Sequence, residues 1–100
     1  MSKTYNDHLR EERRLVLLRL LAEQAGYRAN SSTLHAGLSF LAIPGSRDDV
    51  NTDLAWLKDQ GYVEMTTALE GVHVVTLSIR GHDVATGQAI VPGVRRPGPK

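Results

Sequence analysis

The sequence predicts an α+β protein that is mainly α-helical. Three segments carry apolar residues at the spacing of amphipathic helices, and a proline- and glycine-containing break separates the second segment from the third. Two short stretches that follow are alternating or β-branched, as expected of a hairpin. The 100 residues fit one domain, and 41% of them are apolar, which is a normal share for a globular chain.

The first helix is predicted over residues 7–25, because Gly26 follows it as a typical helix stop. One side of this helix is apolar through Leu9, Val16, Leu17, Leu20 and Leu21. The opposite side is apolar through Leu15, Leu18 and Ala22. A helix with two apolar sides needs a second packing partner. Two possible partners remain open. Either Leu15, Leu18 and Ala22 form a homodimer contact, or a later segment of the same chain covers them.

Capping residues define the next two helices. The second begins after residues 30–32 and carries Leu34, Leu38 and Leu41 at helical spacing. Residues 42–45 end it, because proline and glycine cost about 3 and 1 kcal/mol in a helix. The third begins at Ser46, an N-cap followed by two aspartates, and ends before Gly61. Its buried stripe is Val50, Leu54 and Leu57. Trp56 lies beside that stripe, so we expect it to be partly buried against the hairpin.

A hairpin, a short helix and a tail complete the chain. Residues 62–67 and 72–77 are the predicted strands, and residues 78–85 are a short closing helix. Residues 91–100 are rich in proline, glycine and cations, and we expect them to form a mobile basic tail. The domain proper is predicted over residues 1–90.

The order of these elements predicts a winged helix-turn-helix domain. A two-stranded hairpin does not stand alone, so it must pack on the core of the three helices. A three-helix bundle with a two-stranded wing and a short closing helix is the winged arrangement of the helix-turn-helix class.

Two stretches resemble segments of bacterial winged-helix proteins. Residues 46–63 contain a leucine pair, Leu54 and Leu57, and end in Gly61, an aromatic residue and valine. This pattern resembles the step from a recognition helix into a wing. Residues 77–85 are similar to the Leu-Ser/Thr-x-x-Gly-x-x-Val-Ala pattern that follows the wing. The whole chain also resembles a family of small proteins of Mu-like phages and prophages, through residues 13–21, 53–57 and 91–97.

This phage-family resemblance implies a phage origin, a bacterial cytoplasmic location and a task related to DNA. Members of the family are often labelled as regulator-like. The resemblance supplies no established functional residues, so the candidate site has to come from the chemistry of the sequence itself.

Residue types argue against several other classes of protein. No cysteine is present, so disulfides and thiolate metal sites are excluded. The four histidines share no short ligand spacing, and neither a Gly-x-Ser-x-Gly elbow nor a glycine-rich phosphate loop occurs. We therefore expect no metal, no cofactor and no enzymatic activity. The longest apolar run, residues 15–22, is interrupted by Arg19 and is too short to span a bilayer, so we expect a cytoplasmic protein without membrane contact.

The third helix carries the predicted contacts to double-stranded DNA. Arg47 can donate two hydrogen bonds to guanine, and Asn51 can pair with adenine in a bidentate way. Thr52 can contact a thymine methyl group or a phosphate, and Lys58 can contact phosphate. The second helix offers neutral phosphate contacts at Ser31, Ser32, Thr33 and His35.

Cations elsewhere in the chain add candidate contacts. His73 and Arg80 lie in or near the predicted wing, and the tail offers Arg95, Arg96 and Lys100 as a phosphate-binding arm. The arginines of the first helix are predicted to form a solvated face, paired with nearby glutamates; they are Arg10, Arg13, Arg14 and Arg19.

The charge of the third helix supports a second function. Residues 46–60 contain two cations and four anions, and the whole chain has a net charge of only +1, whereas DNA-reading surfaces are usually basic. Two functions therefore remain open. One is a DNA-binding regulator or accessory factor, and the other is a winged-helix adaptor that binds a phage or host protein without reading DNA.

Overall fold

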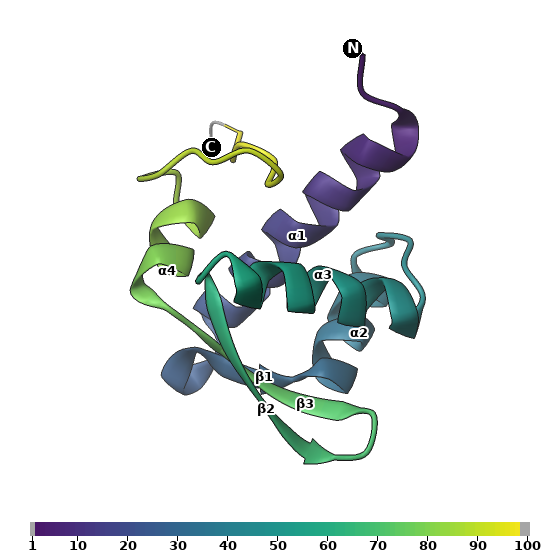
Figure 1. The fold of residues 1–100 in the computed structure, drawn as a ribbon, viewed down its shortest axis with the longest axis vertical. Coiled ribbons are helices and arrows are strands. Elements are labelled where there is room, and N and C mark those ends of the chain that lie inside the picture. Colours follow the sequence, from purple (N-terminus) through teal and green to yellow (C-terminus); the bar gives the residue numbers. More distant parts are fainter. Residues whose placement is uncertain (1, 99–100) are drawn as a thin grey trace.

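The computed structural model describes residues 2–98 and places four helices around a small sheet (Figure 1). The elements in chain order are α1 (Tyr5–Glu23), β1 (Arg28–Asn30), α2 (Ser31–Phe40), α3 (Arg47–Asp59), β2 (Val63–Leu69), β3 (Val72–Leu77) and α4 (Ile79–Ala85). A 3₁₀ turn, Ala25–Tyr27, joins α1 to β1. The described chain is α+β and mainly helical, which confirms this coarse part of the prediction.

Side-chain caps explain where α1 and α3 begin. The N–H of Asp7 donates to Oγ1 of Thr4 at 3.1 Å, and the Asp7 carboxylate accepts from the N–H of Thr4, so α1 starts two residues earlier than predicted. The same reciprocal pair joins Ser46 and Asp49 at the start of α3, with both bonds 3.0 Å long. Aspartate thus fills the place that glutamate or glutamine usually takes in a capping box.

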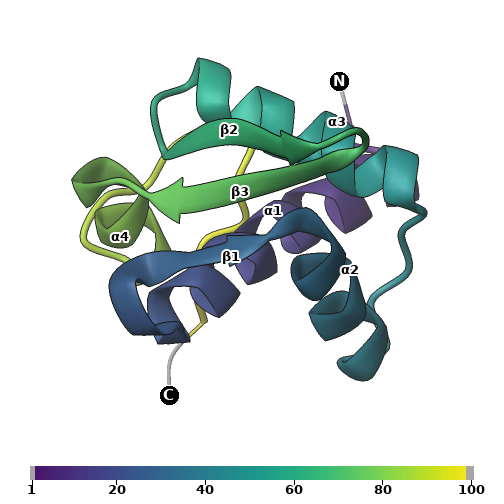
Figure 2. The ribbon, with the colours of Figure 1, turned by 90° about the horizontal axis from the view of Figure 1, so that it is seen from below.

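The sheet has three antiparallel strands in the order β1-β3-β2 (Figure 2). In the hairpin, Val63 pairs with Leu77; on the other side of β3, Arg28 pairs with Thr76. The strand β1 was not predicted from the sequence, because three residues are too few to show an alternating pattern. This strand decides where α2 begins, since α2 starts at the residue that follows β1. The start of α2 is thereby held beside the hairpin.

The core is formed by all four helices and by the inner face of the sheet. Its fully buried members include Leu17, Leu21, Leu34, Leu38, Val50, Leu54, Leu57, Val75 and Val84. The predicted leucine stripes of α2 and α3 converge there, with one exception: Leu41 follows the end of α2 and is exposed.

The side of α1 that was predicted to meet a second chain is buried within this one. Leu15 and Leu18 belong to the core, because α4 and β3 pack against α1 on that side. Ala22 is half-buried against the same core. The predicted homodimer contact through Leu15, Leu18 and Ala22 is therefore wrong, and a later segment of the same chain covers them. Val16 and Leu20, predicted to face the core, are only half-buried.

The first eight residues of the predicted tail, 91–98, pack on the domain instead of forming a mobile arm. Val94 is buried in the core, and the backbone N–H of Arg95 donates to the carbonyl of Glu11 at 3.2 Å. Gly93 lies against Trp56: a Cβ atom at position 93 would stand 2.6 Å from the indole ring. The separation into a domain and a free tail therefore does not hold for these residues.

A helix that crosses a membrane must have about 20 consecutive, mostly apolar residues. Within residues 2–98, no helix is both long and apolar enough to cross a membrane.

Gly81 allows α4 to pack directly on the backbone at the start of the hairpin. A Cβ atom at this position would lie 2.0 Å from the carbonyl oxygen of Tyr62, which is fixed backbone. We expect Gly81→Ala to lower the free energy of unfolding by at least about 2 kcal/mol, because α4 must move away from Tyr62. Urea unfolding followed by circular dichroism measures this loss.

Gly98→Ala is the matched control for this substitution. Nothing lies within 4 Å of the added methyl group at position 98. The urea midpoint of Gly98→Ala should therefore equal that of the parent chain. Equal midpoints for Gly81→Ala and the parent would contradict the described packing of α4.

Candidate nucleic-acid interface

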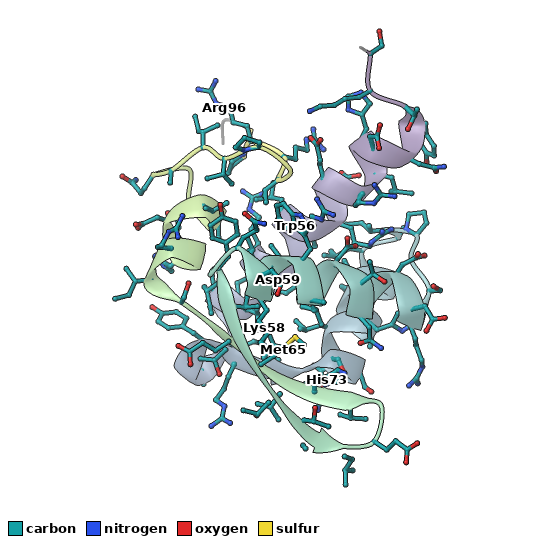
Figure 3. All side chains as sticks on the ribbon, viewed as in Figure 1. Trp56, Lys58, Asp59, Met65, His73 and Arg96 are labelled. Carbon is teal, nitrogen blue, oxygen red and sulfur yellow. The ribbon has the colours of Figure 1, made fainter. Side chains whose placement is uncertain are left out.

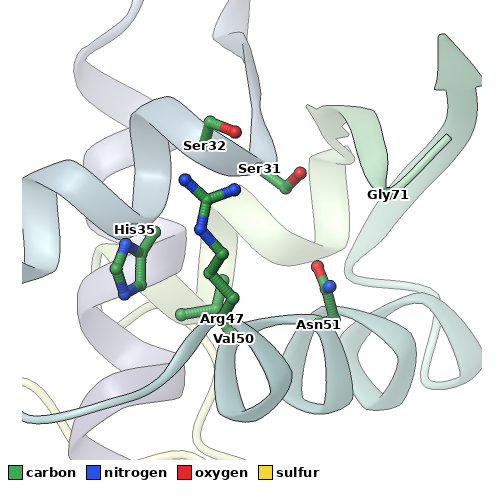
Figure 4. A pocket seen from close by; sticks show the side chains of 7 residues that line it. All are labelled: Ser31, Ser32, His35, Arg47, Val50, Asn51 and Gly71. Atoms are coloured by element: carbon green, nitrogen blue, oxygen red, sulfur yellow. The ribbon is translucent and has the colours of Figure 1, made fainter. Parts of the chain in front are cut away.

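A polar groove lies between the start of α2, the first half of α3 and the tip of the hairpin (Figure 4). Its lining residues are Ser31, Ser32, His35, Arg47, Val50, Asn51 and Gly71. The hollow itself is only about 10 Å³, which is room for one water molecule. Pockets for small organic ligands are typically about 300–1,000 Å³. The groove is therefore too small to enclose an organic substrate.

Two of the predicted base-reading residues meet in this groove. Arg47 is the first residue of α3, and its exposed side chain extends toward the start of α2 (Figure 4). Asn51 follows one turn later and is half-buried. Ser46 and Asp49 cap the helix just before and after Arg47, so the direction of this first turn is well defined. An arginine and an amide thus project from one end of α3 on the same side.

The α2 residues of the groove have different environments. Ser31 is buried, and its hydroxyl oxygen accepts a 3.0 Å hydrogen bond from the backbone N–H of His73 in β3. Its predicted role as a phosphate contact is therefore wrong, and it joins α2 to the hairpin instead. Ser32 is half-buried in the groove. His35 lies beside it, with Nε2 3.1 Å from the carbonyl oxygen of Gly45 in the turn before α3.

Three other predicted contacts on α2 and α3 lie away from the groove lining. Thr33 faces the opposite side of α2, where it lines a hollow shared with α1. Thr52 and Lys58 are exposed on α3, but neither lines the groove. Lys58 is eleven residues after Arg47, so the two cations are about 16 Å apart along the helix.

The predicted wing and tail cations do not gather at the hairpin tip. The Arg80 guanidinium lies 5.4 Å from the ring centre of Tyr62, where α4 meets the base of the hairpin. Arg95 forms an ion pair of 2.9 Å with Glu12 of α1. Arg96 is exposed at the end of the molecule opposite His73 (Figure 3). Lys100 lies outside the described residues.

A buried charge cluster that was not predicted from the sequence lies behind the groove. Asp53 is 1% exposed, and its carboxylate accepts hydrogen bonds from Nε of Arg13 and, at 3.1 Å, from Nε of Arg14. The prediction that these two arginines form a solvated face is wrong. Nη1 of each arginine also donates to a backbone carbonyl, at 3.1 Å to Pro44 for Arg13 and at 3.0 Å to Gly93 for Arg14.

A signal for this cluster was present in the heptad spacing of α3. Asp53 occupies the same stripe as Val50, Leu54 and Leu57, so an aspartate stands among core positions. A carboxylate is buried only when cations or hydrogen-bond donors compensate it. The spacing therefore points to buried cations in the rest of the chain, although it does not say which ones they are.

Trp56 is partly buried, as predicted, but only part of its contact is with the hairpin. Its ring lies 6.3 Å from that of Tyr62, which precedes β2. The guanidinium of Arg14 stacks 3.9 Å from the centre of the indole, and Gly93 packs against the ring. Trp56 thus links α3 to α1 and to residues 91–98.

Burial of Asp53 changes the charge that α3 presents to a partner. All four aspartates of the helix were counted against DNA binding, but the charge of Asp53 is compensated inside the protein. The exposed face retains Arg47 and Lys58 together with Asp48, Asp49 and Asp59. Asp49 already accepts the N–H of Ser46, and this hydrogen bond holds the pKa of its carboxyl below the ordinary value.

A metal site needs at least three ligand side chains close together. Within residues 2–98, no three histidine or acidic side chains stand together as a metal site would require.

The fold and the groove define a small, mainly helical α+β domain with a polar groove between two helices and a hairpin. The chain is 45% identical to the uncharacterized protein gp26 of Escherichia phage Mu over 95 residues, which cover 95% of this chain and 97% of gp26. It therefore belongs to the family of phage Mu gp26. This relationship confirms the resemblance to proteins of Mu-like phages.

An uncharacterized protein of Haemophilus influenzae is a second relative. It is 36% identical over 77 residues, which cover 77% of this chain and 74% of the relative. The sequence matches no established family profile, and no solved structure matches it at a significant level.

The Asp53 cluster should dominate the response of the fold to charge substitutions. Asp53→Asn leaves two buried guanidinium groups without a counter-charge, and the pKa of Arg14 is already lowered by its burial. We expect a loss of about 3–5 kcal/mol in the free energy of unfolding. Denaturant titration of Asp53→Asn against Asp59→Asn tests this, because Asp59 is exposed and its variant should remain within about 0.5 kcal/mol of the parent.

The capping carboxylates make stability depend on pH in acid. The pKa values of Asp7 and Asp49 are lowered in the folded chain, chiefly because backbone N–H groups donate to them. A depressed folded pKa stabilises the fold above the pKa of the unfolded chain, and this stabilisation is lost as the pH falls through the folded value. The free energy of unfolding should therefore decrease below about pH 4, the ordinary range for aspartate.

Comparison with an Asp7→Asn/Asp49→Asn double variant isolates the contribution of the caps to this slope. Denaturant unfolding at several pH values between about 5 and 3 should show a shallower decrease for the double variant than for the parent. If the free energy of unfolding decreases equally with pH in the parent and the double variant, the two caps do not contribute to the pH dependence of stability.

Proposed function

We propose that this chain is a winged helix-turn-helix protein that binds double-stranded DNA in the bacterial cytoplasm, as a transcription regulator or a DNA-associated accessory factor. The order α1, β1, α2, α3, β2, β3 and the pairing of β1 with the hairpin support this assignment, because α3 then lies in the position of a recognition helix and the hairpin in that of a wing. The observation that carries the proposal is that Arg47 and Asn51 meet the start of α2 and the hairpin tip in one groove.

In this function the first turns of α3 enter the major groove. Arg47 donates two hydrogen bonds to N7 and O6 of guanine, and Asn51 contacts adenine. Ser32 and His35, across the groove from them, bind the adjacent phosphates and set the register of α3 on the duplex. Thr52 and Lys58 contact the backbone farther along α3.

The internal compensation of Asp53 supports a DNA partner. An unpaired carboxylate on the middle of α3 would repel phosphate, whereas one that is buried between Arg13 and Arg14 contributes little field outside the protein. Asp49 is likewise engaged in the capping box of α3.

The second candidate function is a protein adaptor in phage assembly, DNA packaging or interaction with the host. The three exposed aspartates of α3 favour it, as does the position of Arg96, which lies at the other end of the molecule from His73 of the hairpin (Figure 3). In this case the same groove and α3 surface bind a basic or polar protein segment, and duplex DNA does not compete for it.

Binding of fluorescent duplexes, selected from a randomised pool, distinguishes the two functions. DNA binding predicts that Arg47→Ala weakens affinity for the selected duplex by about 5- to 150-fold, the value of one bidentate base contact. Lys58→Ala should weaken all duplexes to a similar extent and reduce the salt dependence by about one phosphate contact.

Arg96→Ala is the matched control, because it removes the same charge at the other end of the molecule. Equal losses for Arg47→Ala and Arg96→Ala would contradict base reading in the groove. If the parent chain binds no duplex more tightly than about 10⁻⁶ M at low salt, the DNA-binding function is rejected and the adaptor function is favoured.

A further inference from the structure

A second surface, on the opposite side of α2 from the polar groove, is a hollow of about 770 Å³ between α1 and α2, here called the α1–α2 groove. Its residues are Val16, Arg19, Leu20 and Glu23 of α1, Thr33, Ala36, Gly37 and Phe40 of α2, and Leu41. On each helix the members are spaced i, i+3, i+4 and i+7, so one continuous face of each helix forms a wall.

The floor of this groove is apolar and its rim carries an exposed aromatic side chain. Phe40 is 89% exposed, and Leu41 next to it is 48% exposed. Gly37 allows Leu20 of α1 to pack directly on α2, because a Cβ atom at position 37 would lie 2.9 Å from Cδ1 of Leu20. An apolar hollow and a protruding aromatic side chain on one face are typical of a protein–protein contact.

The charges on the α1 rim are complementary to a second copy of the same rim. Arg19 and Glu23 are one helical turn apart, and neither forms an ion pair with any residue in the part of the chain from 2 to 98. If two α1 helices cross antiparallel about a two-fold axis, Arg19 of each copy faces Glu23 of the other. Two ion pairs then form, whereas a parallel arrangement would place like charges together.

We propose that two copies of this chain associate through the α1–α2 groove as a symmetric homodimer with antiparallel α1 helices. Phe40 of each copy inserts toward the hollow beside Gly37 of the other, and Arg19 pairs with Glu23 across the axis. This contact differs from the one predicted from the sequence, since Leu15 and Leu18 are in the core and Val16, Leu20 and Phe40 take their place.

The dimer leaves the polar groove accessible. Ser32 and His35 line the polar groove on one side of α2, whereas Ala36, Gly37 and Phe40 line the α1–α2 groove on another side. Association therefore does not depend on the proposed DNA binding, and it is measured without nucleic acid.

Sedimentation velocity of the purified full chain over a concentration series tests the proposal. We expect twice the chain mass at micromolar concentrations, and a monomer for Phe40→Asp. Arg19→Glu and Glu23→Arg should each raise the dissociation constant at least about tenfold, because like charges then meet twice. The double variant Arg19→Glu/Glu23→Arg should restore association, since it exchanges the charges and keeps their complementarity. Circular dichroism verifies that each variant is folded.

Ile79→Asp is the matched control, because Ile79 is 85% exposed on α4 and lies outside the groove. It should remain dimeric. A parent chain that is monomeric up to about 100 µM overturns the proposal. Failure of the double variant Arg19→Glu/Glu23→Arg to restore association also overturns the proposal. If Arg19 of one copy meets Glu23 of the other, exchanging both charges restores the two ion pairs.

Discussion

The buried ion cluster of Asp53 is the interaction on which the arrangement of the other parts depends. Arg13 and Arg14 of α1 both donate to its carboxylate through Nε, and their Nη1 atoms donate to the carbonyls of Pro44 and Gly93. A buried carboxylate is costly unless its charge and its lone pairs are compensated, and here two guanidinium groups do so. One charge in α3 thereby joins α1, the turn before α3 and the C-terminal segment.

This cluster also determines how the polar groove is built. Arg13 holds the carbonyl of Pro44, and His35 lies within hydrogen-bond distance of Gly45, so the turn that precedes α3 is fixed from two sides. The first turn of α3 follows directly, and with it the direction of Arg47. Because Asp53 points inward, the surface that α3 offers to a partner is less acidic than the composition of the helix indicates. The buried Asp53 cluster and the surface that α3 exposes at the polar groove therefore depend on the same helix.

Most of the elements could be predicted from local patterns. Helical spacing, the cap at Ser46 and the break before it identify α2 and α3, and alternation identifies the hairpin, because these signals act over a few residues. The grouping of Arg47 with Asn51 also follows from helix geometry, since they are one turn apart. By contrast, β1 and the role of Ser31 could not be predicted, because both depend on pairing with β3 more than forty positions later.

Local chemistry alone was therefore enough to place the helices, the turns and the hairpin, and to identify which end of α3 carries hydrogen-bonding side chains. It could not decide which side of α1 is buried, where the charge of Asp53 is neutralised, or whether residues 91–98 are packed. These outcomes depend on contacts between residues as much as 84 positions apart, as between Glu11 and Arg95. An amphipathic pattern predicts that the apolar face of a helix will be buried. Which segment packs on that face is decided by the packing of the whole chain.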